Sequence, residues 1–215
     1  MKYEKLKRVI DIVLSILLII LFSPIMLVTA LLIKLTSRGP VLVEPTVPKR
    51  AGKDGVPFRL YKFRSMIVNA YDLLRTDPKF KKAFEEQQKG GNYKIMNDPR
   101  ITPIGSFIRK YSIDETPQFF NVLKGEMSII GPRPYYPDEL KMQQEKFPKT
   151  KKSVKEALSV KPGITGYWQV TGRSNVKFDK RISIDAMYAR NVSFVLDLEI
   201  LMRTPWAMLS GKGAV

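Results

Sequence analysis

The sequence contains neither cysteine nor histidine. The absence of cysteine excludes a disulfide framework, a thiolate nucleophile and a thiolate-bound metal. The absence of histidine removes the commonest general base and the commonest ligand of transition metals. Any chemistry must therefore come from carboxylates, amines, guanidinium groups and hydroxyls. A bound metal ion should be a hard cation such as Mg²⁺, which prefers oxygen ligands.

Acidic residues are also scarce. The 215 residues include 37 Lys and Arg but 20 Asp and Glu, which gives a formal net charge of +17. Such an excess predicts a polyanionic partner, which is either nucleic acid, an anionic membrane surface or a phosphorylated substrate. The length fits one compact domain with a peripheral segment, and hardly two full domains.

The peripheral segment is an apolar run over residues 12–33 that carries no charged side chain. At 1.5 Å per helical residue it is about 33 Å long, just enough to cross a bilayer core. Length alone favours a single transmembrane helix. However, Ser23 and Pro24 stand in its middle. Proline removes a backbone donor and clashes with the preceding turn, so we expect a sharp bend there.

Both flanks of the apolar run are basic, whereas a spanning helix usually has a Lys/Arg asymmetry that sets its orientation. The flanking cations are Lys2, Lys5, Lys7 and Arg8 before the run, and Lys34, Arg38, Lys49, Arg50 and Lys53 after it. We therefore favour a re-entrant helix-break-helix hairpin over residues 1–36 that enters and leaves on one face. Asp11 at its entrance is expected to pair with Lys7 or Arg8.

The remaining residues, 37–215, predict one catalytic unit of a mainly helical α+β class. A small β-hairpin is expected from strands near 41–47 and 56–63, with a turn at 53–55. Helices are expected over 66–90 with an interruption at Pro78, within 97–111, over 114–124 ending at Gly125, and over 137–158. A loop and strand follow over 161–174. A last helix over 182–209 should break near Pro205. Its Trp206, Met208 and Leu209 fit either a membrane interface or an ordinary core.

Two adjacent acids, Asp114 and Glu115, lie in the stretch SIDETPQFF. A structural interpretation is a capping box with Ser112 as the cap. Pro117 weakens it, because proline is most comfortable in the first helical turn and so favours a helix that starts at Asp114. A functional interpretation is also open, because a helix start collects phosphate groups.

Several cations are candidates to meet a phosphate near these acids. Arg133 stands between two prolines that fix its backbone, and guanidinium binds phosphate oxygens in a bidentate way. The set comprises Lys62, Arg64, Arg100, Arg109, Lys110, Arg133 and Arg173. Acids among such groups suit a divalent cation that meets a diphosphate. A carboxylate can then act as nucleophile toward phosphorus, with Mg²⁺ stabilising the leaving phosphate.

These motifs resemble those of the bacterial sugar transferases called monotopic phosphoglycosyl transferases. The matching elements are KRVID, the SP pair in the apolar run, YKFRSM, the long stretch DPRITPIGSFIRKYSIDETPQFFNVLKGEMSIIGPRP, KPGITGYWQVTGRS, and DLEIL with the GKGAV ending. They cover nearly the whole chain, and the long central motif is very specific.

The resemblance implies an enzyme at the cytoplasmic face of the bacterial inner membrane. Such an enzyme moves a sugar 1-phosphate from a UDP-sugar to polyprenyl (undecaprenyl) phosphate, releases UMP and initiates exopolysaccharide or lipopolysaccharide synthesis. It further implies a ping-pong cycle with Asp114 as nucleophile, and Mg²⁺ held by Glu115 with Asp114. The implied substrate-binding residues are Lys62, Arg64, Arg109, Arg133 and Arg173, and Ser23-Pro24 is the implied hairpin break.

The chain departs from the family pattern in two places. The segment LVEPTVPKRAG is longer than usual and lacks a Gln that precedes R-x-G, and TPQ replaces LPQ. The WQVTGRS and GKGAV elements, with the 67–95 insertion, favour the hexose-1-phosphate branch. Which sugar is used, the polyprenyl length and the oligomeric state (a homodimer is one option) stay open.

Two non-enzymatic hypotheses compete with this one. Charge alone fits a membrane-anchored nucleic-acid-binding protein, but no recognised nucleic-acid motif is present, so we expect no nucleic acid as partner. The other is a membrane scaffold without catalysis.

Overall fold

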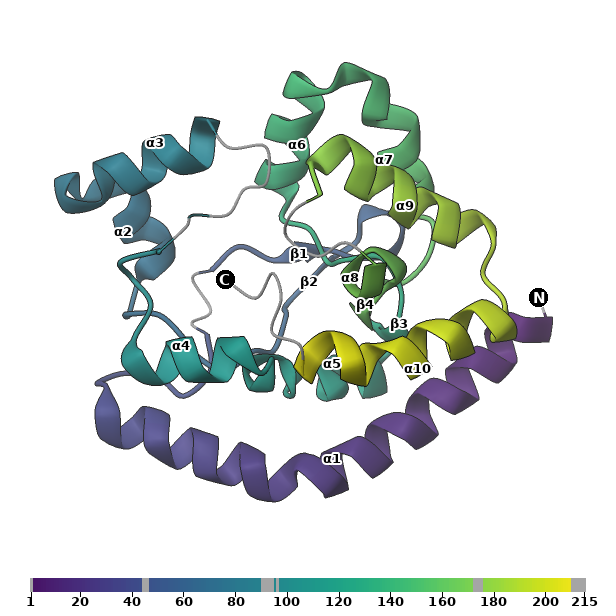
Figure 1. Ribbon diagram of the computed structural model, residues 1–215, viewed down its shortest axis with the longest axis horizontal. Coiled ribbons are helices and arrows are strands. Elements are labelled where there is room, and N and C mark those ends of the chain that lie inside the picture. Colours follow the sequence, from purple (N-terminus) through teal and green to yellow (C-terminus); the bar gives the residue numbers. More distant parts are fainter. Residues whose placement is uncertain (1, 44–46, 90–94, 96, 172–175, 210–215) are drawn as a thin grey trace.

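The computed structural model describes residues 2–43, 47–89, 95, 97–171 and 176–209. Helices dominate this part of the chain, and its strands are two or three residues long. The expected mainly helical α+β class is therefore confirmed. Figure 1 shows the long N-terminal helix α1 (Lys2–Thr36) along one edge of the molecule. Most of the other elements lie together on one side of this helix.

Helix α1 is continuous through Pro24, so the predicted break into two helices is wrong for the backbone. The helix curves gently instead (Figure 1). The Ser23 hydroxyl donates to the carbonyl of Ile20 at 2.8 Å, a local hydrogen bond within the helix beside the proline. Helix α1 is long and apolar enough to cross a membrane, by length and composition.

The faces of α1 are inverted relative to a helix of a soluble protein. Its packed face buries polar side chains, namely Asp11, Ser15 and Thr29, together with Ile33. Its outer face exposes large apolar side chains, listed here in chain order: Leu6, Val9, Val13, Ile16, Leu17, Ile20, Leu21, Ile25, Leu27, Val28, Leu31, Leu32 and Leu35. An apolar surface of this extent marks an interaction with an apolar medium or partner.

The KRVID motif attaches the start of α1 to the rest of the protein. Lys7 Nζ lies 2.6 Å from Asp197 Oδ2, and Arg8 donates to the carbonyls of Val122 and Leu123. Asp11 accepts from the Ser128 hydroxyl and the Ile129 amide, both at 3.0 Å. The expected pairing of Asp11 with Lys7 or Arg8 is therefore wrong. The three charged side chains thus attach α1 to three different elements, α10 (Phe194–Leu209), α5 (Gln118–Lys124) and β3 (Ser128–Ile130).

The predicted β-hairpin is present with a displaced register. Strands β1 (Arg50–Ala51) and β2 (Pro57–Phe58) pair antiparallel, and an isolated bridge joins Leu42 to Phe63. The turn between the strands is η1 (Lys53–Gly55), as expected, with Asp54 and Gly55 at positive φ. The expected strand over 41–47 is thus represented by its first residues only, and residues 44–46 lie outside the described part.

The middle of the chain folds into short helices close to their predicted places. They are α2 (Ala70–Thr76), η2 (Pro78–Phe80), α3 (Lys81–Lys89), α4 (Pro103–Lys110), η3 (Ile113–Glu115) and α5 (Gln118–Lys124). Pro78 separates α2 from α3 as expected. Thr102 caps α4 by accepting from the Gly105 amide at 3.0 Å. Gly125, at φ 82°, ends α5 as predicted.

The strand expected within 161–174 is confirmed, but its parallel pairing with a second strand was not foreseen. Strand β3 (Ser128–Ile130) pairs with β4 (Gly163–Thr165), which is followed by helix α8 (Tyr167–Thr171). A Cβ atom on Gly163 would lie 2.1 Å from the Gly131 nitrogen, so only glycine permits this approach. The pairing fixes the start of the GPRP loop, which begins at Gly131.

The helix predicted over 137–158 is divided, which was not expected, and the one predicted over 182–209 is divided at 191–193 and not near Pro205. Pro148 splits the first into α6 (Pro137–Lys146), η4 (Pro148–Thr150) and α7 (Lys151–Ala157). The second consists of α9 (Phe178–Arg190) and α10 (Phe194–Leu209), with Pro205 inside α10. The break lies at 191–193, because the Ser193 hydroxyl accepts from the Leu196 amide and caps a new helix.

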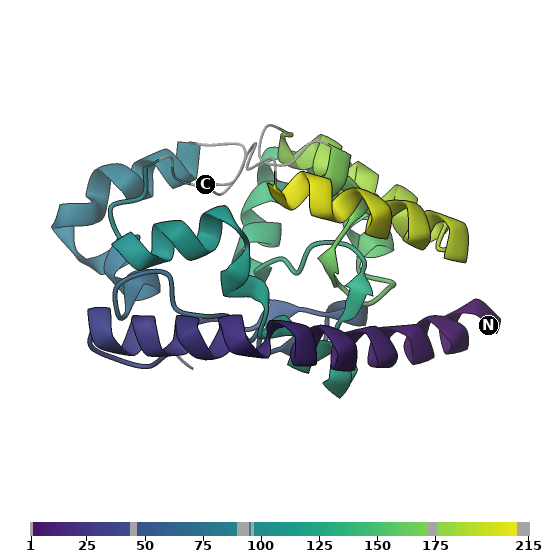
Figure 2. The ribbon, with the colours of Figure 1, turned by 60° about the horizontal axis from the view of Figure 1, so that its bottom comes forward.

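Helix α10 exposes a second apolar face, and its Trp206 is 79% exposed, which excludes a core position. The other large exposed apolar side chains of α10 are Phe194, Val195, Leu198 and Met202. The side chains of Met208 and Leu209 lie outside the described part. Figures 1 and 2 show the start of α10 near the start of α1, where Tyr3 and Phe194 contact edge to face.

Candidate active site: a buried carboxylate pair under an arginine cluster

The two adjacent acids lie in η3, a short 3-10 turn between α4 and α5. Ser112 precedes it with a left-handed backbone (φ 55°), which turns the chain sharply. The Phe63 amide donates to the Asp114 carbonyl at 2.9 Å and ties the turn to the β-hairpin segment. Asp114 is 2% exposed, whereas the Glu115 side chain is 34% exposed. The pair therefore has one buried member and one that faces outward.

Both predicted starts for this helix are wrong. Ser112 makes no capping hydrogen bond, because its left-handed conformation directs the chain away from the helix. Asp114 is not the cap either, since α5 begins at Gln118 with Pro117 as its N-cap. Pro117 has no amide hydrogen with which to continue an α-helical pattern. The turn instead closes by a 3-10 bond from the Thr116 amide to the Ile113 carbonyl.

Lys62 joins the two carboxylates. Its ammonium lies 2.7 Å from Asp114 Oδ2 and 3.3 Å from Glu115 Oε1. The 2.7 Å contact between Lys62 Nζ and Asp114 Oδ2 is an ion pair. It is not a hydrogen bond, because no donor among the described residues is aligned with Oδ2. The prediction that Lys62 lies beside Asp114 and Glu115 is confirmed, and its role in substrate binding stays a prediction.

Burial controls the electrostatics of this pair. Burial raises the pKa of Asp114 above its ordinary value, and Lys62 opposes the rise without cancelling it. Burial also acts to lower the pKa of Lys62, but Asp114 and Glu115 together outweigh it and raise that pKa. Lys62 therefore stays charged, and Asp114 is ionised more readily when cations lie beside it.

The other predicted cations divide into two groups. Arg133 belongs to the site, because its charge interacts with Glu115 and its guanidinium lies 3.9 Å from the buried Glu139. Arg109, in the last turn of α4, lowers the pKa of Asp114 by its charge. Arg173 lies outside the described residues.

Arg64 and Arg100 serve the fold instead. The Arg64 side chain is buried and donates to the carbonyls of Pro40 and Ser37 and to the Ser37 hydroxyl. Its guanidinium is therefore engaged beyond the end of α1, and its role as a substrate ligand stays a prediction. Arg100 is likewise buried, paired with Asp98 and bonded to the Ala70 carbonyl.

Sequence reasoning missed a set of buried charges behind Arg133. Glu139 is fully buried and lies 3.2 Å from Arg181, which is also buried. The Tyr135 hydroxyl donates to Asp185 at 2.8 Å, and burial raises the pKa of Asp185 to about 7. A signal was available, since α6 and α9 each carry charged residues at positions that would otherwise be apolar.

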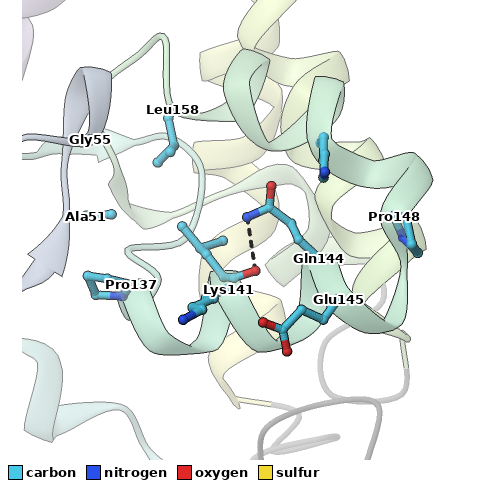
Figure 3. A pocket seen from close by; sticks show the side chains of 10 residues that line it. Ala51, Gly55, Pro137, Lys141, Gln144, Glu145, Pro148 and Leu158 are labelled. Carbon is cyan, nitrogen blue, oxygen red and sulfur yellow. Dashed lines mark hydrogen bonds between the residues drawn. The ribbon is translucent and has the colours of Figure 1, made fainter.

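A hollow among the described residues lies away from the carboxylates. It has a volume of about 560 Å³ and lies between β1–η1 and α6 to α7. Figure 3 shows Lys141, Gln144 and Glu145 of α6 along its wall, with Gln144 bonded to the Leu140 carbonyl. Its lining includes neither Asp114 nor Glu115, so this hollow is separate from the carboxylate pair.

The carboxylate pair fits Mg²⁺ that arrives with a phosphorylated ligand. No cluster of three or more His, Cys, Asp or Glu side chains that could hold a metal occurs in the described part of the chain. Mg²⁺ is commonly held by one or two carboxylates with substrate phosphates and water. Asp114 Oδ2, buried without an aligned donor, and the half-exposed Glu115 carboxylate supply that number of oxygen ligands.

Comparison with known proteins identifies the family. The model of the family described as "Bacterial sugar transferase" matches residues 2–211, and the chain belongs to that family. It is 41% identical over 97% of its length to a Salmonella typhimurium protein named undecaprenyl-phosphate galactose phosphotransferase, and covers 41% of that protein. It is 39% identical over 97% of its length to a Klebsiella pneumoniae UDP-glucose:undecaprenyl-phosphate glucose-1-phosphate transferase, again covering 41%.

A relative of more similar size is the exopolysaccharide production protein ExoY of Sinorhizobium fredii. The two are 35% identical over 97% of this chain and 87% of ExoY. The chain thus spans less than half of the Salmonella and Klebsiella proteins but most of ExoY.

Proposed function

We propose that the protein transfers a sugar 1-phosphate from a UDP-sugar to polyprenyl (undecaprenyl) phosphate and releases UMP. The observation that carries the proposal is the placement of Asp114. It is buried, lies 2.7 Å from Lys62 and interacts by charge with Arg109. Arg133 interacts by charge with the neighbouring Glu115. The names of the Salmonella and Klebsiella relatives give the same class of reaction for those proteins.

The first step is attack of an Asp114 carboxylate oxygen on the phosphorus that bears the sugar. The bond between this phosphorus and the bridging oxygen breaks, UMP leaves with that oxygen, and an acyl phosphate of the sugar forms on Asp114. In the second step an oxygen of polyprenyl phosphate attacks the same phosphorus and releases the carboxylate. The result is a polyprenyl diphosphate sugar and the regenerated enzyme.

The residues around Asp114 have distinct parts in this scheme. Lys62 keeps the carboxylate ionised and meets incoming phosphate charge, while Arg133 and Arg109 bind phosphate oxygens. Asp114 and Glu115 would hold Mg²⁺, which when bound neutralises the diphosphate and stabilises the leaving phosphate. We expect chelation by EDTA to stop turnover and added Mg²⁺ to restore it.

The direct test is UMP release from a panel of UDP-sugars by the purified protein in detergent, with polyprenyl phosphate and Mg²⁺. We expect one sugar class to be used, with a hexose preferred over an acetamido sugar. UMP release from no UDP-sugar, by a folded protein with Mg²⁺ and acceptor present, would contradict the proposed function.

The membrane arrangement is also part of the proposal, with both ends of α1 on the cytoplasmic face of the inner membrane. Arg8 near the start of α1 contacts α5, and Ile33 near its end packs with Phe63 and Ile108. Both ends therefore contact one folded body whose interior carries the charges of Lys62 and Asp114. A hydrocarbon layer between the ends would have to contain these charges, which is strongly unfavourable. The apolar outer faces of α1 and α10 would then rest in the membrane.

This topology predicts the result of chemical labelling at two positions. Single cysteines that replace Lys5 and Lys53 should react with an impermeant thiol reagent from the same, cytoplasmic side, because Lys5 lies in the first turns of α1 and Lys53 follows its end. The chain has no native cysteine to interfere. Labelling of spheroplasts and of inverted vesicles gives the comparison. Reaction from opposite sides would establish a spanning helix instead.

A further inference from the structure

Arg50, a flanking cation of the apolar run in the sequence, lies beside the GPRP loop in the fold. We propose that Arg50 and Arg133 form a two-guanidinium site for the diphosphate of the donor, with Tyr136 as the ring that positions Arg50. This inference rests on the proposed function and names a further substrate-binding residue.

The backbone of β1 brings Arg50 to the GPRP loop. The Ala51 amide donates to the Tyr135 carbonyl at 2.9 Å, so β1 lies against the residues that follow Arg133. Successive strand side chains point to opposite faces. Ala51 lines the hollow of Figure 3, and Arg50 therefore points to the other face. Helix α6 divides the same way, with Lys141 at the hollow and Glu139 against Arg133.

Two contacts fix the guanidinium of Arg50 in one place. Its Nη1 donates to the Pro134 carbonyl at 3.3 Å, and its central carbon lies 3.1 Å from the centroid of the Tyr136 ring. The same ring also lies 6.0 Å from the ring of Tyr71, between centroids. A guanidinium has five N–H donors. In the described residues one of these five is engaged by a hydrogen bond, and the rest are available to a ligand.

Two acids, Glu139 and Glu115, act on Arg50 by charge, and neither forms an ion pair with it. No carboxylate in the described part of the chain lies within ion-pair distance of it. Glu139 has a larger charge effect on Arg50 than Glu115 has. However, Glu139 already contacts Arg133 and Arg181. Burial and the neighbouring Arg133 lower the pKa of Arg50. Two fixed guanidinium groups beside each other are relieved by an anion with several oxygens, and a diphosphate matches their forked geometry.

The position also suits the reaction. The charges of both Arg50 and Arg133 interact with Glu115, so the arginine pair borders the carboxylates. A diphosphate held there would present its sugar-bearing phosphorus toward Asp114. Tyr136 has a positioning role, because it touches Arg50 and no reacting atom.

Binding of UDP to the full-length protein in detergent, by calorimetry, tests the inference without turnover. We expect Arg50→Met to weaken UDP binding by about 10- to 100-fold, as for loss of charge-assisted hydrogen bonds. Methionine keeps an unbranched apolar side chain and removes the guanidinium that lies on Tyr136. Arg50→Lys should fall between, because it keeps the charge but loses the fork. In turnover, the KM for UDP-sugar should rise more than kcat falls.

The matched control is Lys141→Met, which removes a cation from the opposite face of α6 and should leave UDP binding unchanged. Equal UDP affinity in Arg50→Met and wild type, both with unaltered thermal transitions, would overturn the inference while UMP release by wild type upheld the proposed function. A wild type that binds UDP but releases no UMP from any UDP-sugar would refute the function instead. If Lys141→Met weakened UDP binding as much as Arg50→Met, the loss would reflect the net charge of the protein and not a site at Arg50, which would also overturn the inference.

Discussion

Replacement of Asp114 by asparagine should abolish UMP release, with a loss on the order of 10³-fold or more, because an amide cannot serve as the nucleophile toward phosphorus. The substitution keeps the size of the side chain in a position that is 2% exposed. It also removes a buried charge whose pKa burial raises. The fold should therefore persist, and the thermal transition of Asp114→Asn should match or exceed that of wild type.

The control for this result is Thr116→Ala, two residues away in the same turn. The Thr116 hydroxyl donates to the Ile113 carbonyl at 2.8 Å, so its loss should destabilise the turn by about 1 kcal/mol and leave the chemistry in place. Comparable loss of turnover in both variants would indicate that the turn, and not the carboxylate, is what matters. Full activity of Asp114→Asn would remove Asp114 as nucleophile.

Replacement of Lys62 by methionine should have the second largest effect, a loss of turnover of about 10²-fold or more at neutral pH. Lys62 is the cation in ion-pair contact with Asp114, and its removal leaves a buried carboxylate without a partner. The pKa of Asp114, which burial already raises, would rise further, so less of the nucleophile is ionised. Because ionisation increases with pH, turnover of Lys62→Met should recover as the pH rises, over a range where wild type changes little.

A pH profile of kcat for both proteins measures this shift. Lys180→Met, which removes an exposed cation of α9, serves as the charge-matched control and should follow wild type at every pH. A flat, reduced profile for Lys62→Met would assign Lys62 to phosphate binding alone. Wild-type turnover of Lys62→Met would show that the ion pair is structural.

The positions of the site residues follow from local sequence features to different degrees. The helices around Pro78, Thr102 and Gly125 were predictable, because proline, a threonine cap and a left-handed glycine act within a few residues. The pair of parallel strands was not, since β3 and β4 are three residues each and are separated by α6 and α7. Their pairing depends on the close approach of Gly131 and Gly163, which no local pattern expresses.

The candidate site shows the same division. The acids and Lys62 were identified from motif and chemistry, and the structure brings them within ion-pair distance. Arg64 was assigned to substrate because it stands two residues from Lys62, yet its guanidinium is engaged by Ser37 and Pro40. Arg50 was overlooked for the complementary reason. Its place beside the GPRP loop is created by a strand contact across more than 80 residues of sequence.

Helix α1, the expected membrane segment, was likewise predictable only in part. Composition predicted its apolar run, but the direction of its polar residues could not be known from length and hydropathy. Asp11, Ser15 and Thr29 are buried against the protein, while the apolar side chains face outward. Pro24 bends the helix without ending it, because a proline inside a helix removes one hydrogen bond and leaves the rest in place.

The most direct test of the account is the intact mass of the protein after incubation with its UDP-sugar and Mg²⁺ in the absence of polyprenyl phosphate. We predict that wild type gains the mass of one sugar phosphate, that the adduct maps to Asp114, and that added polyprenyl phosphate removes it. Asp114→Asn should show no adduct. An adduct on Asp114→Asn, or normal turnover by wild type with no adduct even after rapid quenching, would contradict Asp114 as the covalent nucleophile.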